Sequence, residues 1–283
     1  MEKPDGWDEF EKKVQELPSY VYFADEQDTR RSLLFGGLLI HREKLHLLDE
    51  GMAEAKSSVG LPANAPIKWS PPNSHEYAAQ RALDPKQRPL LREKVLALLA
   101  GLECTCFFSM SWKFDPGYTS ECYKSNFKYV LQRLSITMER SVRRTGAVWY
   151  PALDVVVDWF PQPQRCKEYF AIYHEAYHSG YSFARNKLLP LKTHGACPCL
   201  LVTSCQFSPA LQLTDFCVGS MGTLLRWAYE KHIQVGRVKE IVTPVVKHLL
   251  RINHKVIGYG LVLPTTGAAR RKVSDALAEL GVL

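Results

Sequence analysis

The sequence predicts an α/β protein in which one mixed β-sheet carries helices on both faces. Patterns typical of strands and helices alternate along most of the 283 residues, an order that favours βα units. The segment Leu153–Phe160 is apolar without alternation around Val155–Val157, as in a strand that is buried on both faces. The composition, 46% hydrophobic and 23% charged, is that of a chain with a substantial core.

The first elements are predicted to form a helix and a hairpin. Residues 6–17 are amphipathic and indicate a short helix, which Pro18 ends. The run Ser19–Asp25 is rich in aromatic and β-branched residues, and Ser32–His41 is apolar, so both are predicted strands. Because only a short polar segment separates them, we expect these two strands to pair antiparallel.

The middle of the chain alternates helical patterns with a loop and a further strand. Apolar residues recur there at helical spacing, and prolines interrupt the pattern once. The predicted elements, in order, are helix Arg42–Ser58, a loop at 60–74, helices His75–Leu83 and Arg88–Leu102, strand Glu103–Trp112 and helix Ser120–Arg144.

The second half continues the alternation. After Leu153–Phe160 we expect a helix at Lys167–Tyr181, a strand at Cys199–Cys205, and a helix at Pro209–Lys231 that has proline in its first turn. This order predicts parallel pairing of the strands that follow the initial hairpin. Residues 236–283 suggest helix, short strand and helix, so we divide the chain into a core, 1–235, and a C-terminal extension, 236–283.

The bulk properties narrow the functional classes. The charged N-terminus has no apolar run behind it, and stretches such as Leu33–Ile40 are too short to span a bilayer, so we expect a cytoplasmic protein with no membrane partner. The eight cysteines lack the spacing of a zinc knuckle and are expected as reduced thiols. The net charge of +7 favours a polyanionic partner such as nucleic acid, and basic runs in the extension are candidates for backbone contact.

Three aspartates stand where a sheet of this kind brings side chains together. Asp25 closes the first strand, Asp158 lies near the end of the buried strand, and Asp215 lies in the first turns of the helix at 209–231. Carboxylates gathered beside apolar strands repel each other unless a cation neutralises them. Magnesium prefers such ligands, and two ions can activate a water and stabilise the leaving oxygen of a phosphodiester. The alternative is that each is a strand-end or helix-cap residue.

Four short blocks between residues 20 and 220 resemble a known family. Tyr22–Glu26 followed by Leu34–Leu38 resembles the opening of the domain-of-unknown-function 3800 family. Leu211–Asp215, with Ser204 upstream, is similar to that family's Gln-x-x-Asp motif. The remaining two blocks are Ile67–Ser70, which resembles its lysine motif, and the strand carrying Asp158, in which Asp154 is the other candidate for the matching residue.

The resemblance implies a ribonuclease H-like fold with Asp25, Glu26, Asp158 and Asp215 as an acidic cluster for two Mg²⁺ or Mn²⁺ ions. It implies a nuclease acting on RNA or DNA, in a bacterial defence or mobile-element setting. Lys68 would then contact a phosphate or hold the attacking water. Gln212 and Ser204 are, with Lys68, the candidate substrate-binding residues. Gln212 would orient Asp215 or cap its helix.

The sequence departs from that fold in two places. A ribonuclease H core opens with three antiparallel strands before its first helix, whereas the patterns here predict two, and an extra strand–helix unit, 103–144, precedes Asp158. A glutamate of the first helix completes the acidic set in many relatives of the fold. Glu43, Glu50 and Glu54 are available for that position, and the sequence does not choose among them.

A competing motif is His174-Glu175-Ala176-Tyr177-His178, which matches the H-E-x-x-H pattern of zinc peptidases. Such a site needs a third ligand, but Tyr181 and Ala184 stand where a metzincin has glycine and histidine, and His194 has no familiar spacing. We therefore favour magnesium or manganese over zinc. A non-catalytic subunit of a nucleic-acid-associated complex, with a protein partner, is the other alternative.

Overall fold

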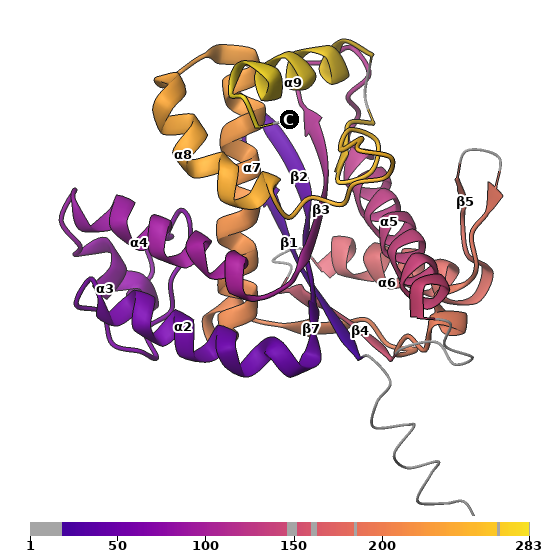
Figure 1. Cartoon of the computed structure of the whole chain (residues 1–283), viewed down its shortest axis with the longest axis horizontal. Coiled ribbons are helices and arrows are strands. Elements are labelled where there is room, and N and C mark those ends of the chain that lie inside the picture. Colours follow the sequence, from indigo (N-terminus) through magenta and orange to yellow (C-terminus); the bar gives the residue numbers. More distant parts are fainter. Residues whose placement is uncertain (1–18, 146–151, 160–162, 184–185, 265–266, 283) are drawn as a thin grey trace, which may run out of the picture.

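The computed structural model describes residues 19–145, 152–159, 163–183, 186–264 and 267–282. Its centre is a six-stranded mixed sheet with the strand order β7-β4-β1-β2-β3-β8 (Figure 1). The α/β class with one mixed sheet is therefore confirmed. The helix expected at 6–17 lies outside the described residues.

Three consecutive antiparallel strands form one half of the sheet. β1 (Tyr20–Asp28) pairs with β2 (Ser32–His41), as the short turn between them predicts. β3 (Thr105–Trp112) pairs antiparallel with β2, so the expectation of parallel pairing for this strand was wrong. The reason is that the chain leaves the sheet at the end of β2 and returns to the same end, where Thr105 lies opposite Leu39. The helices between β2 and β3 therefore form an insertion beside the sheet and do not make a crossover connection.

The other strands pair parallel, as predicted for 153–160 and 199–205. β4 (Leu153–Asp158) lies beside β1, and β7 (Leu201–Thr203) lies beside β4. β8 (Leu261–Val262) pairs parallel with β3 at the opposite edge. Because β1, β4 and β7 run in the same direction, their carboxyl ends meet at one edge of the sheet, which is where ligands bind in open α/β sheets.

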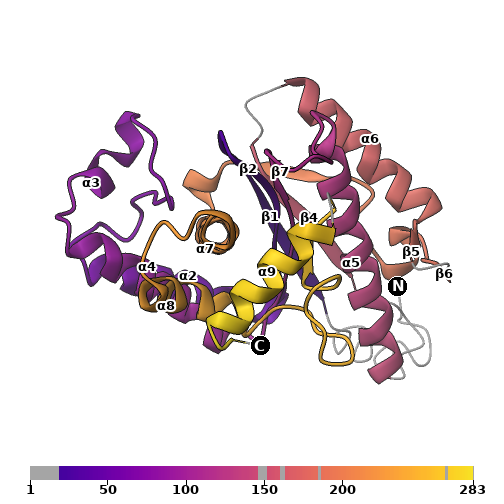
Figure 2. The same ribbon diagram turned by 90° about the horizontal axis from the view of Figure 1, so that it is seen from above.

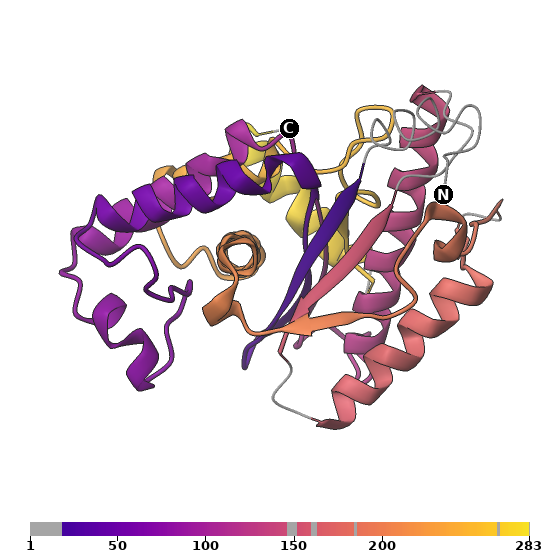
Figure 3. The same ribbon diagram turned by 90° about the horizontal axis from the view of Figure 1, so that it is seen from below.

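Helices cover both faces of the sheet (Figures 2 and 3). The side chains of β1 alternate between two apolar clusters, so that Phe23 faces one layer of helices and Tyr22 faces the other. The layer on the Phe23 face consists of α2 (Leu45–Ser57), α4 (Gln87–Ala97), α7 (Pro209–Glu230), α8 (Val235–Val246) and α9 (Gly267–Glu279). The layer on the Tyr22 face consists of α5 (Cys122–Thr145) and α6 (Pro163–Ser179).

Short elements complete the chain. α3 (Ala78–Arg81) lies in the insertion, and β5 (Ser182–Phe183) and β6 (Asn186–Lys187) form a separate hairpin. Single 3-10 turns occupy Arg42–Lys44, His75–Tyr77, Leu98–Gly101, Leu191–His194 and Cys205–Phe207. In the described parts of the chain no helix has the length and apolarity required to cross a membrane.

The C-terminal extension shares the core of the rest of the chain. Val238 and Val242 of α8 and Val273 of α9 belong to the same apolar cluster as Phe23, and β8 adds a strand to the main sheet. The predicted boundary at residue 235 therefore coincides with the start of a helix but does not separate two hydrophobic cores.

Candidate functional site

Asp25, Asp158 and Asp215 meet at the edge where β1 and β4 end. Asp25 points to the α7 face of the sheet, as Phe23 does two residues earlier, and Asp158 is the last residue of β4. Both side chains are buried, each residue being 6% exposed. Asp215 faces them from the second turn of α7, and the charges of Asp158 and Asp215 both act on Asp25.

Backbone N–H groups hold these carboxylates in place. The N–H of Glu26 donates to Asp25 Oδ1 at 2.7 Å. Asp158 Oδ1 accepts from Trp159 N at 2.8 Å and from Cys205 N at 2.7 Å, which ties the end of β4 to the turn after β7. Hydrogen bonds of this kind stabilise an ionised carboxylate and fix its orientation.

Lys68 brings a positive charge into the cluster from the loop at 60–74. Its Nζ lies 3.0 Å from Asp158 Oδ2. The next residue, Trp69, donates its backbone N–H to Asp215 Oδ2. The loop segment is thereby fixed to both β4 and α7. The sequence prediction that Asp25, Lys68, Asp158 and Asp215 lie together agrees with this arrangement.

The cluster carries more negative charge than Lys68 neutralises. Burial, together with the charges of Asp215 and Asp158, holds the pKa of Asp25 well above its ordinary value. Burial also raises the pKa of Asp215, against the opposing effect of Lys68. Although burial disfavours its charged form, Asp25 and Asp215 raise the pKa of Lys68 above the ordinary value. A proton or a further cation is therefore favoured at Asp25 and Asp215.

Contacts with α3, α4 and α7 position Lys68. The side-chain amide of Gln80 in α3 makes two hydrogen bonds to the backbone of Lys68. Lys68 N donates to Gln80 Oε1 at 2.8 Å, and Gln80 Nε2 donates to Lys68 O at 2.6 Å. The ring of Trp69 lies against α7 at Gly219, and the Arg92 guanidinium stacks 4.3 Å from its centroid. A Cβ at Gly219 would lie 2.1 Å from Trp69 Cγ, so only glycine allows this close approach.

Gly219→Ala is expected to destabilise the protein by about 1–3 kcal/mol, because the rigid Trp69 ring has to move away from α7. The matched control is Gly236→Ala in α8, where an added Cβ meets no atom within 4 Å. Urea unfolding of both variants measures the difference. Equal stabilities would show that Trp69 does not depend on Gly219.

Glu26 does not join the cluster. Neighbouring residues of a strand point to opposite faces, so Glu26 faces α6 while Asp25 faces α7. There it forms an ion pair with Arg165 and accepts a hydrogen bond from the Tyr169 hydroxyl. Arg165 also binds Asp28 at 2.8 Å. This network joins β1 to α6 on the face opposite to the candidate site.

The other predicted residues lie around the cluster or away from it. Asp154, at the start of β4, pairs with Arg42, so Asp158 is the aspartate of this strand that reaches the site. Gln212 Nε2 donates to Cys205 O at 3.1 Å, which steadies the turn whose N–H binds Asp158. Ser204 precedes that turn. Glu43, Glu50 and Glu54 are exposed on the 42–57 segment.

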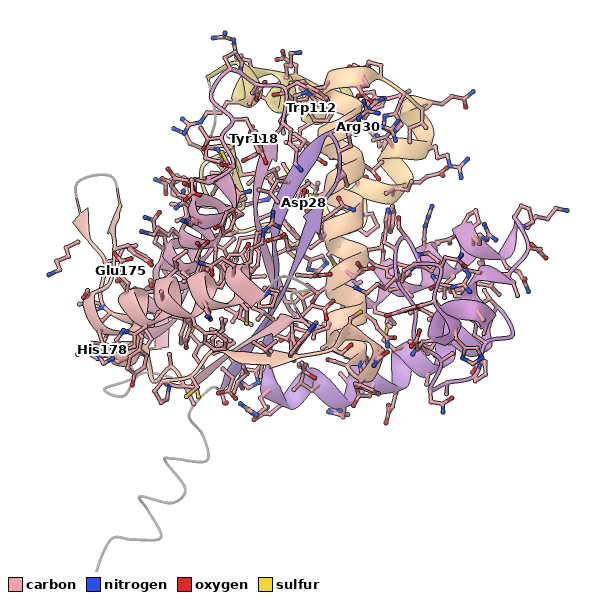
Figure 4. All side chains as sticks on the ribbon, turned by 180° about the vertical axis from the view of Figure 1, so that it is seen from behind. Asp28, Arg30, Trp112, Tyr118, Glu175 and His178 are labelled. Carbon is pink, nitrogen blue, oxygen red and sulfur yellow. The ribbon has the colours of Figure 1, made fainter. Side chains whose placement is uncertain are left out.

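The H-E-x-x-H motif lies on α6, in the other layer of helices. The rings of His174 and His178 are 4.3 Å apart, and Glu175 pairs with Lys128 at 3.2 Å. Figure 4 shows Glu175 and His178 on α6, well away from α7. Within the described residues, no group of three or more His, Cys, Asp and Glu side chains is arranged as a bound metal ion requires. This holds for the two histidines and equally for Asp25, Asp158 and Asp215, where Lys68 is bound to Asp158.

Gln80 and the turn at Cys205–Phe207 were not found from the sequence. Gln80 acts through its contacts with the backbone of Lys68, and a single glutamine in a short helix carries no signal of that contact. Cys205 contributes its backbone N–H to Asp158, a group that every residue except proline has.

No protein-family model, curated protein or solved structure matches this chain.

Proposed function

We propose that this protein is a nuclease that depends on a divalent cation and cleaves phosphodiester bonds of nucleic acid. The observation that carries the proposal is the convergence of Asp25, Asp158 and Asp215 on one edge of the sheet, with Lys68 among them. Buried carboxylates gathered in this way are unfavourable unless protons or cations compensate them, and perturbed carboxyl groups of this kind cluster at functional sites.

A ribonuclease H-like fold is part of the proposal. The sequence suggested two departures from this fold, a missing third antiparallel strand and an extra strand–helix unit at 103–144. Both have one explanation, because the strand of that unit, β3, is the third antiparallel strand and residues 42–104 are inserted before it. β4, which carries Asp158, then lies parallel to β1, which carries Asp25. This arrangement supports the resemblance to the domain-of-unknown-function 3800 family, which remains a proposal.

Asp25, Asp158 and Asp215 offer the donor type of a site for Mg²⁺ or Mn²⁺, and a bound ion would have to draw their carboxylates closer together than they lie here. Aspartate oxygens are the ligands that these ions prefer. Burial is the largest cause of the raised pKa values of Asp25 and Asp215, and repulsion between the carboxylates adds to it in spite of Lys68. Backbone N–H groups donate hydrogen bonds to Asp25 and Asp158 and fix the orientation of these carboxylates. Hydrogen-bond donors around the ligands of a metal site have the same role. Cation binding requires Lys68 to share or release its contact with Asp158.

Each residue has a separate role in the proposed site. Asp25, Asp158 and Asp215 would hold the cation, two ions being the usual number for phosphodiester hydrolysis. The bound cation would lower the pKa of a water and stabilise charge on the phosphate. Lys68 is placed to exchange its contact with Asp158 for a non-bridging phosphate oxygen. Gln80 and Trp69 hold the backbone around Lys68 in position.

Lys68→Met separates cation binding from cleavage. Removal of the ammonium should strengthen Mn²⁺ binding by roughly 10-fold, since a like charge leaves the site. Cleavage should slow by about 10- to 100-fold, because the phosphate loses a charged contact. Lys44→Met, a change at a surface lysine that pairs with Glu103, is the control. Weaker Mn²⁺ binding in Lys68→Met would mean that Lys68 orders the carboxylates instead.

The experiment that tests the function is a cleavage assay on labelled RNA and DNA, single-stranded and duplex, with Mg²⁺, Mn²⁺ or chelator. We expect cleavage of at least one substrate with a cation and none with chelator. Cleavage that persists in chelator would exclude the cation site as its source. No cleavage of any substrate would favour the alternative of a non-catalytic subunit.

A further inference from the structure

A cavity of about 600 Å³ lies beside the acidic cluster. The turn at Cys205–Phe207 connects the two, because the N–H of its first residue donates to Asp158 and its last residue lines the cavity. The remaining wall comes from α2, the loop at 60–74, Glu76 and the start of α7. Phe207 and Gln212 both line this cavity.

Two features of this cavity suit a flat, polar-edged ligand. The Phe207 ring is 77% exposed, although it is a large apolar side chain. Gln212 is buried, and its Oε1 has no hydrogen-bond partner among the described residues, whereas its Nε2 donates to Cys205 O. A buried acceptor without a partner costs free energy that a ligand donor would recover. An exposed ring beside a buried acceptor matches the face and the N–H edge of a nucleobase.

A second exposed aromatic residue follows the acidic cluster directly. Trp159 comes after Asp158 in the chain, donates its backbone N–H to that carboxylate, and is 67% exposed. Phe207 and Trp159 therefore both extend from segments that bind Asp158 Oδ1. These two exposed rings are candidates to stack on the bases that flank a phosphate bound near Asp158, and aromatic stacking of this kind accepts any base.

Positive charge continues along the same edge of the sheet. Arg30, Arg31 and Arg226 line a cavity of about 340 Å³ between the β1–β2 turn and α7, with Trp69 in its wall. Figure 4 shows Arg30 beside Trp112 at this end of the molecule. Arg31 and Arg226 share Glu230, so the cavity keeps an excess of positive charge that suits a phosphate backbone.

We propose that the Phe207–Gln212 cavity receives an unpaired base next to the scissile phosphate, so that the substrate is single-stranded nucleic acid. The base stacks on Phe207, and a rotation of the Gln212 side chain exposes the shielded Oε1 to an N–H of that base, while the neighbouring base stacks on Trp159. In a duplex the base faces are covered by stacking and the N–H edges by pairing, so neither contact forms. This inference rests on the proposed nuclease site for its orientation and deepens it by naming the substrate class.

The test is equilibrium binding of a labelled single-stranded oligonucleotide, as DNA and as RNA, and of a duplex of the same sequence, followed by fluorescence anisotropy. The protein carries Asp25→Asn and the buffer contains chelator, so that binding is measured without cleavage. Phe207→Ala and Trp159→Ala are added singly to this background. Phe170→Ala is the matched control, because Phe170 is 42% exposed on α6, in the other layer of helices.

We expect the single strand to bind more tightly than the duplex. Phe207→Ala and Trp159→Ala should each weaken its binding by roughly 5- to 100-fold, the range for loss of one stacked base, and Phe170→Ala should not. Equal binding of single strand and duplex, or unchanged binding in both variants, would overturn the inference. Because no step depends on cleavage, these outcomes are independent of whether the proposed nuclease activity is found.

Discussion

Asp158→Asn is expected to reduce cation-dependent cleavage by at least about 100-fold, whereas Asp154→Asn, on the same strand, is expected to leave it nearly unchanged. Both changes remove one carboxylate from β4 and keep the size of the side chain. Asp158 is buried in the cluster beside Lys68, while Asp154 pairs with Arg42 at the other end of the strand. Single-turnover rates with Mn²⁺ measure the difference.

The comparison also tests the other two carboxylates. Asp25→Asn and Asp215→Asn should lose as much cleavage activity as Asp158→Asn, because all three carboxylates lie close enough to act on the charge of Lys68. Circular dichroism and the urea midpoint of each variant establish that the fold is intact. Loss of cleavage in Asp154→Asn, with full activity in Asp158→Asn, would contradict the assignment of the site.

The second large effect concerns the free energy of unfolding of Asp25→Asn. We expect it to increase, whereas most substitutions of buried residues decrease it. The pKa of Asp25 is raised in the folded protein by burial and by Asp215 and Asp158. Stability from such a group is fully present below the unfolded pKa of about 3.9 and is lost as the pH rises through the folded pKa. At neutral pH Asp25→Asn should therefore stabilise the cation-free protein, on the order of 1–3 kcal/mol.

Divalent cations should reverse the order of stability. The wild-type protein should gain stability when Mn²⁺ is added in excess, because the folded state binds the ion and the unfolded state does not. Asp25→Asn should gain little. Urea unfolding at pH 5 and pH 8, with chelator and with Mn²⁺, measures both effects. A wild-type protein that is more stable than Asp25→Asn in chelator at pH 8 would show that the carboxylate is compensated without a cation.

The main elements of the fold and the acidic cluster could be predicted because their causes are local. The short polar segment between β1 and β2 is compatible only with an antiparallel hairpin, and the apolar run of β4 indicates a strand in the middle of the sheet. Once those strands are parallel neighbours, Asp25 and Asp158 fall at the same edge.

What the sequence did not predict depends on contacts between distant segments. The direction of β3 is set by where the chain re-enters the sheet after 63 residues, between His41 and Thr105, and no local pattern records this. Glu26 was expected with Asp25, but strand alternation gave it Arg165 and Tyr169 as partners on the other face. Gln212 was expected to orient Asp215 or to cap its helix, and its Nε2 donates to the carbonyls of Cys205 and Gln206 in the turn before α7.

Titration of Mn²⁺ into the purified protein by isothermal calorimetry tests the central claim most directly. The account predicts stoichiometric binding by the wild-type protein with release of protons, because the pKa values of Asp25 and Asp215 are raised before the cation binds. The proton release appears as a dependence of the measured heat on the ionisation enthalpy of the buffer. Asp25→Asn and Asp215→Asn should lose this binding. Binding of equal affinity in the wild-type protein and in both variants, or none in any of them, would contradict the claim that these carboxylates form a cation site.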